Sequence, residues 1–549
     1  MSSPRDSIMS GGTHAASDIY PNAPAGAHLF LDGAGNNKKP ALYYYPSLNH
    51  PHDDLYAHAA AAANTTAAPS LHEDKRSIVP TPDSVATILN LHFWRRCYTV
   101  ALMSIMSFLG LVGVTAFFPS VADFTDVVNI SQEGVAAALA ACCLFTSIFP
   151  IFWAKFADKF GRRQALLVTL SCFVVTSAVL AGVSHTNIIA YAAVRLLHGA
   201  VATAFLVLAA AVISDIVAVD HRGRAIGFAL VLPLLGPVAG ARLSQVSNIA
   251  VTFGVIAGVA AIVLVLIFFT VPETQRDLVT AKHYGYVSSE RAATVDDSPL
   301  HVFKYLTHPV SALGTLAVSI AFGVFLGWFS AAYPQVSNFA GLENASKMTS
   351  TLSWTLLTTG LGAAAGSIIA GNLCDIPYRH IAEAILSSEK LIEENGVNST
   401  AANAPPSALA INAKAATRRL AWIYPGLVIY PAGIITFGWA VSSTSSSQLS
   451  YSLASSFFLG FGFGYTMAIA ITYLLDAVER RPEGVIALCH TVGGVVAAIC
   501  LAIVPVMQDH LSQGWTFTIL GAAPLLVLPV VLVLRLRGAA MLSAGYVAV

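Results

Sequence analysis

The sequence predicts an all-α, polytopic membrane protein with twelve transmembrane helices arranged as two six-helix halves. Three observations lead to this prediction: few charged side chains, apolar blocks long enough to span a bilayer, and charged motifs that recur at matching positions of the two halves. Only 11% of the 549 residues are charged, and 56% are hydrophobic. Charged residues make up about 25% of a typical soluble domain, so the composition argues against a soluble protein.

The apolar blocks have the length of membrane-spanning helices. Residues 250–271, "AVTFGVIAGVAAIVLVLIFFTV", contain no ionisable group and would form a helix of about 33 Å, which matches the hydrocarbon core of about 30 Å. Runs of this length are too long for barrel strands, so helices must satisfy the backbone in lipid. Twelve such segments are predicted, at 98–119, 134–154, 165–184, 188–213, 225–241, 250–271, 309–333, 351–372, 420–442, 449–475, 484–506 and 514–534.

Polar stretches divide the chain into parts. The first 92 residues are rich in Ala, His, Pro, Asn and Ser without sustained periodicity, which is typical of a disordered tail. Within a later polar stretch, "HIAEAILSSEKLIEE" has helical periodicity. The predicted parts are a disordered cytoplasmic tail (1–92), an N-terminal half (93–272), a cytoplasmic central loop (273–308), a C-terminal half (309–536) with a cytoplasmic loop (373–419), and a cytoplasmic C-terminal tail (537–549).

The distribution of cations predicts the orientation, because cytoplasmic loops carry an excess of Lys and Arg. With the N-terminus inside, the outer loops hold only Arg242 and Lys347, and Arg195 lies within a segment. The remaining 26 of 29 Lys and Arg residues are then on the inner side. Both termini are therefore expected in the cytoplasm.

Charged motifs recur at a separation of six segments. Asp158 precedes Arg162 by four residues after segment two, and Asp375 precedes Arg379 by four after segment eight. After segments four and ten, an aspartate precedes a glycine by eight residues (Asp215 and Gly223; Asp476 and Gly484). Such duplication is typical of transporters with a site between two halves.

Three motifs resemble those of a known family. The loop "AKFADKFGRR" (154–163) is similar to the signature loop of the major facilitator superfamily, with Ala154 in place of its first glycine. "RLLHG" and "GFALVLPLLGPVAGA" resemble the helix-four and helix-five motifs of the fungal branch of twelve-helix drug:proton antiporters, of the multidrug-resistance exporter type. The helix-five match comprises Gly227, Gly236, Pro237 and Gly240, with Ala241 in place of the final glycine. The resemblance covers about 95–536.

The resemblance implies both a fold and an activity. The fold would be that of the superfamily, and the activity would be secondary active export of a small organic compound such as a secondary metabolite, toxin or drug. Export would use proton antiport with alternating access. The protein would be a monomer in a fungal plasma membrane, although a vacuolar or other internal membrane stays open, and it would bind substrate, protons and lipid without a cofactor.

The resemblance also assigns a role to the charged joint after segment two. This cluster would hold the two halves together in the outward-facing state, against the start of helix eleven. Its residues are Asp158, Gly161, Arg162 and Arg163, with Asp375 and Arg379 at the corresponding positions of the second half. Asp158 would accept hydrogen bonds from Arg162 and from the amide end of a neighbouring helix, and Gly161 would permit a tight turn. The alternative is that these cations only fix topology.

Candidate residues for proton coupling or substrate binding are Arg195, His198, Asp215 and His490. Arg195 lies within segment four, where a charge costs about 2.5–3.5 kcal/mol and normally faces a partner or cavity. It would bind an anionic group or bias a nearby acid, unless it forms a structural link. His198 and His490 lie in segments that would face each other across the halves, and hydrogen-bonded packing is their alternative. Helix one contains no Asp or Glu, so no proton carrier is identified.

The remaining candidates are aromatic residues, which would line a cavity or anchor the helices, and glycine and proline residues, which would shape helix packing. Trp328, Tyr333, Trp354 and Tyr465 would line an apolar cavity with polar tips or anchor the helices at the interface. The helix-five residues would permit close backbone approach and a kink. In "GFGFG", Gly460 and Gly464 are one turn apart and predict a close-packing face.

Several function classes lack sequence support. The chain shows no Walker motif, no metal-ligand cluster, no paired catalytic carboxylates and no basic, aromatic-interleaved patch. An enzyme, an ATP-driven pump and a nucleic-acid-binding protein are therefore not expected. An organic-acid or polyamine carrier and a non-transporting membrane sensor remain as alternatives. The substrate, the direction of transport and the coupling to protons are not fixed by the sequence.

Overall fold

The computed structural model forms two compact units, Met1–Val79 and Pro80–Val549. It describes residues 27–29, 42–44, 91–116, 132–183, 188–276, 278–279, 299–337, 345–394, 408–443, 447–478 and 482–544. In the first unit, strands β1 (Ala27–Leu29) and β2 (Leu42–Tyr44) pair antiparallel, with Ala27 opposite Tyr44. Apart from these two strands and residues 91–92, the tail predicted at 1–92 lies outside the described residues.

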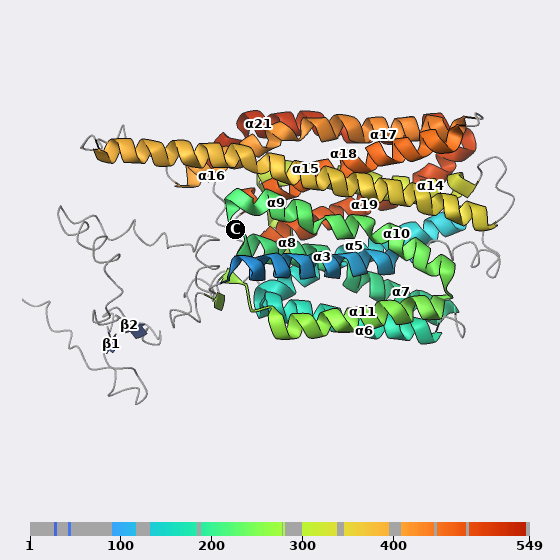
Figure 1. The fold of residues 1–549 in the computed structure, drawn as a ribbon, viewed down its shortest axis with the longest axis horizontal. Helices are drawn as coiled ribbons and strands as arrows, with labels where there is room; N and C mark the ends of the chain where they lie inside the picture. The colour runs from blue at the N-terminus through green and yellow to red at the C-terminus, as the bar shows by residue number, and fades with distance from the viewer. Residues whose placement is uncertain are drawn as a thin grey trace, which may run out of the picture. The chain divides into compact units, whose positions relative to one another are not determined.

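The second unit is a bundle of long helices (Figure 1). Within the described residues, twelve helical spans are long and apolar enough to cross a membrane, which confirms the predicted fold class. The first six are α3 (Phe93–Thr115), α5 (Gln132–Phe160), α6 (Arg162–Val183), α7 and α8 (Ile188–Ala202 and Ala204–Ile216), α9 and α10 (Val219–Ala229 and Val231–Val246), and α11 (Ile249–Thr270).

The second six spans follow the short helix η3 (Pro299–Thr307). They are α14 (Pro309–Ser337), α15 (Ala345–Glu394), α16, η4 and α17 (Ala408–Arg419, Leu420–Trp422 and Tyr424–Ser442), α18 (Gln448–Ala477), α19 (Pro482–His510), and α20, η5 and α21 (Gln513–Ala522, Ala523–Leu526 and Val527–Ala544).

Several helices continue past the apolar segments that predicted them. α5 runs to Phe160 and α15 to Glu394, whereas the apolar segments end at 154 and 372. Polar residues at the end of a span can remain helical once the helix has left the hydrocarbon, so hydropathy alone places these ends too early. The 50 residues of α15 correspond to about 75 Å, and Figure 1 shows α15 projecting beyond its neighbours at one end of the bundle.

Two spans are broken into two helices each. The fourth span is interrupted at Thr203 and the fifth at Leu230. Pro237 lies inside α10 without ending it, so the break in the fifth span comes seven residues before the proline at which the sequence predicted a kink.

The two halves meet mainly along two pairs of spans, the second against the eleventh and the fifth against the eighth. α5 packs against α19, and α9 and α10 pack against α15, which lies beside them in Figure 1. Inside the C-terminal half, α15 and α18 approach at backbone distance: an added Cβ would lie 2.0 Å from a carbonyl oxygen at both Gly460 and Gly464. The predicted close-packing face at these glycines is therefore present.

Candidate functional site

Charged side chains gather at one end of the bundle, where α5, α8 and α18 finish and α6, α9 and α19 begin. We call this the charged end. It contains two polar networks, each placed at a junction between the halves. The first network consists of Asp158, Arg162, Asp215, Arg276 and Glu483, and the second of Arg222, Gly223, Arg224, Asp375, Arg419 and Asp476.

Arg162 is the centre of the first network. Its buried guanidinium contacts three carboxylates: Nη1 lies 3.2 Å from Asp158 Oδ1, Nε 3.3 Å from Asp215 Oδ2, and Nη2 2.6 Å from Glu483 Oε2. Glu483 lies in the first turn of α19 and is fully buried. Because α19 belongs to the C-terminal half, the Arg162–Glu483 ion pair joins the two halves at the start of the eleventh span.

The turn before Arg162 positions its side chain. Gly161 has φ of +100°, a conformation that L side chains adopt rarely. Glu273 then accepts hydrogen bonds from the backbone N–H groups of Arg162 and Arg163, at 2.8 and 3.1 Å. A carboxylate at this position satisfies free amides and complements the dipole at the start of α6. Glu273, in the stretch "VPETQR" at residues 271–276, thus fixes the geometry of the first network.

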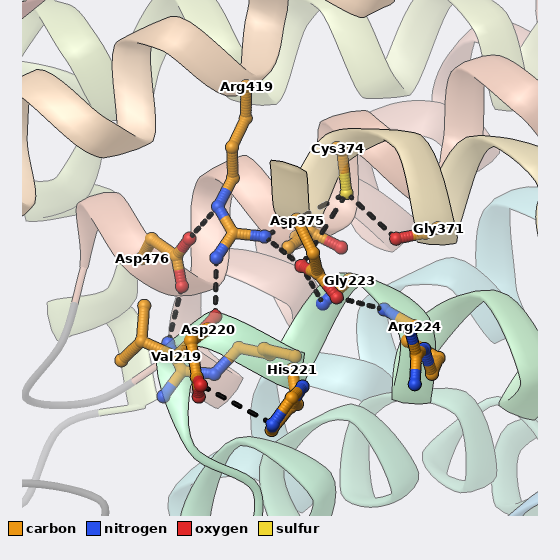
Figure 2. A network of polar contacts seen from close by, with 12 residues as sticks. Val219, Asp220, His221, Gly223, Arg224, Gly371, Cys374, Asp375, Arg419 and Asp476 are labelled. Carbon is orange, nitrogen blue, oxygen red and sulfur yellow. Dashed lines mark hydrogen bonds and ion pairs between the residues drawn. The ribbon is translucent and has the colours of Figure 1, made fainter. Parts of the chain in front are cut away.

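Arg419 is the centre of the second network, shown in Figure 2. It is fully buried, and its Nη1 lies 2.6 Å from Asp375 Oδ1 while its Nε lies 2.9 Å from Asp476 Oδ2. Its Nη2 donates to the carbonyl oxygen of Val219, at the start of α9 in the other half. One guanidinium therefore connects two aspartates of the C-terminal half to the N-terminal half.

Asp375 and Asp476 also contact the N-terminal half directly. Asp375 accepts hydrogen bonds from the backbone N–H groups of Gly223 and Arg224 near the start of α9, at 2.9 and 2.8 Å (Figure 2). Asp476 Oδ1 lies 2.5 Å from Arg222 Nη1. The sequence predicted a hydrogen bond to the amide end of a neighbouring helix for Asp158, and the structure shows such bonds for its counterpart Asp375.

The partner of Asp375 differs from the one suggested by spacing. The four-residue spacing pointed to Arg379, but Arg379 donates to the carbonyl oxygen of Asp220 and contacts His221 Nδ1 at 3.0 Å. The arginine that pairs with Asp375 is Arg419, 44 residues later in the chain. In the first network the next helix begins at once after Gly161, whereas α15 continues to Glu394, so the corresponding arginine comes at the end of α16.

Glycines of the fifth span allow the halves to approach. A Cβ added at Gly227 would lie 2.5 Å from the carbonyl oxygen of Ser367 in α15. Within the N-terminal half, a Cβ at Gly236 would lie 2.8 Å from Leu111 Cβ, and one at Gly240 2.4 Å from Thr115 Oγ1. The helix-five motif therefore permits close packing against α15 on one side and against α3 on the other.

Arg195 lies on α7, away from the charged end. Its Nη1 donates to the carbonyl oxygen of Gly113 at 2.9 Å and its Nη2 to that of Val114 at 3.2 Å, both near the end of α3. Its guanidinium also lies 5.2 Å from the ring centre of Phe253 on α11. The side chain thus links α7 to α3 and α11 inside the N-terminal half.

The two candidate histidines contact residues of their own halves. His198 is fully buried; its Nε2 lies 3.1 Å from Ser177 Oγ and its ring 4.4 Å from that of Phe173. His490 Nδ1 lies 2.9 Å from the carbonyl oxygen of Ile486 within α19, and its ring lies 5.2 Å from that of Phe322 on α14. All of these contacts lie within one half, to α6 for His198 and to α14 and α19 itself for His490.

The remaining candidates are spread over different environments. Trp328 is fully buried against Phe437, with ring centres 5.4 Å apart. Tyr465 is also buried, whereas Trp354 is 51% exposed. Tyr333 lies in α14, but its side chain is outside the described residues. Asp215, predicted for proton coupling or substrate binding, lies in the first network with Arg162 and Arg276. Among the described residues, no group of three or more His, Cys, Asp or Glu is arranged to hold a metal ion.

The two networks meet at one carbonyl group. The oxygen of Ser214 accepts hydrogen bonds from Arg222 at 3.3 Å and from Arg276 at 3.0 Å. In the two networks, the contacts between the halves are ion pairs and hydrogen bonds, which water can replace when the halves separate. A hydrogen bond to a charged group contributes about 1.5–3 kcal/mol, so this end of the bundle can close firmly and still reopen.

Comparisons with known proteins agree with this geometry. Residues 103–386 match the family model described as Major Facilitator Superfamily. The chain is 23% identical over 475 residues to MFS antiporter QDR2 of Candida albicans, covering 82% of this chain and 89% of that protein. It is 25% identical over 485 residues to the cercosporin MFS transporter CTB4 of Cercospora nicotianae, covering 82% and 85%. The crystal structure of the human organic anion transporter MFSD10 (TETRAN) is similar in fold, with a TM-score of 0.54, 13% identity, and coverage of 82% of this chain and 100% of that one.

Proposed function

Since the chain belongs to the Major Facilitator Superfamily, we propose that it is a secondary active transporter that exports a small organic compound by alternating access. The observation that carries this proposal is the pair of networks that join the halves at the charged end. Alternating access requires contacts that hold one arrangement of the halves and are lost in the other. Arg162–Glu483 and Arg222–Asp476, at 2.6 and 2.5 Å, are contacts of this kind.

The proposed location is the plasma membrane, with both termini in the cytoplasm. The excess of Lys and Arg in the loops predicted to lie on the inner side supports this orientation. The charged end then faces the cytoplasm, and the closed networks correspond to an outward-facing transporter. The latch that holds the charged end closed then consists of Asp158, Gly161, Arg162, Arg163 and Asp375. Arg379 lies beside this latch.

The proposed substrate is a secondary metabolite, toxin or drug, exchanged for protons by a monomer. The names of the relatives support this class, since one is described as an antiporter and another as a transporter of cercosporin. Arg195 already donates to two backbone carbonyls, so its geometry gives no specific support to an organic-acid carrier. We assign Arg195 an indirect role in coupling, through the position of α3.

The test is metabolite profiling of the medium and the cells with and without the gene. Export predicts that one or more compounds decrease in the medium and increase in the cells when the gene is deleted, and that wild-type protein restores the distribution. Unchanged profiles, together with no transport by purified protein in vesicles carrying a proton gradient, would contradict the proposal.

A variant lacking residues 1–90 separates a carrier from a sensor. A carrier without this tail should still export its compound, because the twelve spans all lie after residue 90. A sensor that signals through the tail should lose its output while still binding the ligand. Loss of all export in a well-expressed deletion variant would argue against the carrier.

A further inference from the structure

The short helix η3 (Pro299–Thr307) exposes apolar side chains at the charged end of the bundle. We propose that η3 binds the lipid surface: its exposed row of apolar side chains inserts into the leaflet level with the charged end, while its buried row rests on the junction of α5 and α19. The lipid contact does not depend on export. The effect of this contact on closing deepens the proposed alternating-access function and rests on it.

Exposure on η3 repeats every third residue. Leu300, Phe303 and Leu306 are 65%, 40% and 41% exposed, whereas Val302 and Tyr305 are buried. A 3-10 helix has three residues per turn, so side chains at i and i+3 lie directly above one another. The three exposed side chains therefore form one apolar row, about 12 Å long at 2.0 Å per residue.

The buried row places η3 across the junction between the halves. Val302 and Tyr305 belong to the same apolar core as the spans, and η3 packs against α5 of the N-terminal half and against α14 and α19 of the C-terminal half. A Cβ added at Gly484 would lie 2.8 Å from Tyr305 Cε2. Gly484 follows Glu483, the partner of Arg162, so η3 covers the point where the first network joins the halves.

The connection to α14 places η3 level with the ends of the spans. The helix ends at Thr307, and the seventh span begins at Pro309. Ser311 Oγ donates to the carbonyl oxygen of Tyr305, which fixes the corner between the two helices. Gly484, which lies beside Tyr305, is in the first turn of the eleventh span. This level is where the hydrocarbon of a bilayer gives way to the headgroups.

Lipid is the occupant that fits the exposed row. Apolar side chains exposed to water normally occur singly, and a contiguous set indicates a binding surface. Exposed apolar side chains resume at Leu316, two turns into the seventh span, which is 42% exposed, so the row continues the surface that faces lipid. Amphipathic helices at this level bury their apolar face about 5–10 Å into the boundary between headgroups and acyl chains.

The third row of η3 is polar and consists of His301, Lys304 and Thr307. Residues 299–308 contain no Asp or Glu, and Lys304 is exposed. A polar row without acidic side chains suits the negative surface of a leaflet that contains anionic lipid. We therefore expect anionic lipid to strengthen the binding of η3.

Separation of the halves moves η3 away from its place at the surface. The helix is continuous with α14 and rests on α19, so it tilts with the C-terminal half and leaves α5. Its apolar row then no longer lies in the plane of the lipid surface. Lipid binds the closed arrangement better than the open one, and such a difference in affinity is what shifts an equilibrium.

Collision measurements on a spin-labelled amino acid test the lipid contact in the full chain. The protein is reconstituted in nanodiscs of phosphatidylcholine and phosphatidylserine, with the label at Leu300 or, as a control, at Glu383, a 75% exposed side chain of α15 beyond its span. Oxygen concentrates in hydrocarbon, whereas a nickel chelate stays in water. We expect the label at Leu300 to collide mainly with oxygen and the label at Glu383 mainly with nickel.

Two results of this measurement would overturn the proposal. Collisions of the label at Leu300 mainly with nickel would place the row in water. Protection of this label from both reagents would mean that protein covers the row, and loss of that protection after deletion of residues 1–90 would identify the tail as the cover.

The effect on closing is measured with a pair of labels at Arg95 and Glu383, exposed positions on α3 and α15. In the double variant Leu300→Ser/Leu306→Ser, the ratio of closed to open protein should fall about tenfold, because two leucine side chains lose part of their transfer into lipid. Nanodiscs of phosphatidylcholine alone should lower the ratio for the wild type.

Matched variants separate lipid binding from a general effect of polarity. Leu511→Ser changes a 39% exposed leucine at the opposite end of the bundle, and Phe303→Leu keeps an apolar side chain in the row; both should close as the wild type does. Thermal unfolding in detergent should be the same for all variants, since the substituted side chains are exposed.

The remaining outcomes are equally decisive. A double variant that unfolds at a lower temperature in detergent would show that the row packs against protein, and one that closes like the wild type would overturn the role in closing. A failed export assay would leave the collisions at Leu300 unchanged. Collisions with nickel at Leu300 would in turn leave the proposed export intact.

Discussion

Replacement of Arg419 with glutamine tests the second network at its centre. The side chain is fully buried and paired with Asp375 and Asp476 at 2.6 and 2.9 Å. Removing one partner of a buried ion pair costs about 3–5 kcal/mol. Asp375 keeps two amide donors and Asp476 keeps Arg222, so we expect the lower end, about 3 kcal/mol. This free energy corresponds to about two orders of magnitude in the folding equilibrium.

The matched control is Arg379→Gln, which removes the arginine that the four-residue spacing points to. Arg379 contacts a carbonyl oxygen and His221 at the surface, so its loss should cost less than about 1 kcal/mol. The assay is thermal unfolding in detergent, combined with the rate at which maleimide modifies Cys374. This thiol is buried 3.8 Å from Arg419 Nη1 and should react faster only in Arg419→Gln. Equal effects of the two substitutions, or a larger effect of Arg379→Gln, would refute the assignment.

Substitutions at three further positions test the gate and the coupling residue. Asp158→Asn should slow transport at least tenfold in vesicles while membrane insertion, followed by immunoblot, stays normal; wild-type transport would exclude a role in the latch. Arg195→Ala should lower turnover, and Arg195→Lys should restore it only in part, because a point charge replaces two directed bonds; wild-type rates in both would leave the residue a packing role. Gly227→Val should block closing, since its Cβ would lie 2.5 Å from the Ser367 carbonyl oxygen, whereas Gly254→Val on α11 meets no atom within 4 Å and should transport normally.

The sequence predicts the spans well because the signal is local. A block without ionisable groups such as 250–271 has one stable conformation in lipid, and α11 (Ile249–Thr270) has almost the same bounds. The ends of α5 and α15 were placed too early, because residues such as Lys159 or Glu394 do not need lipid to stay helical. Helix continuation past the membrane depends on capping and solvent, which hydropathy does not record.

The candidate site was predicted in part. Asp158, Arg162 and Asp375 were identified from their motifs, but their partners Glu483 and Arg419 were missed. Contacts across helices depend on tertiary packing, which spacing along one chain does not encode. A local signal existed in both cases: Pro482 and Glu483 resemble the first turn of a helix, and Arg419 ends a cationic pair just before the ninth apolar segment.

The backbone contact between α15 and α18 has a mechanical consequence. Helices that touch at Gly460 and Gly464 have no room to slide past each other, so α15 must turn together with its half. Residues 382–394 carry this rigid rod about 20 Å past the end of its span at Ile381. Its tip at Glu394 therefore sweeps a wider arc than any residue inside the bilayer, and a dye attached there would turn a small rotation into a readable displacement.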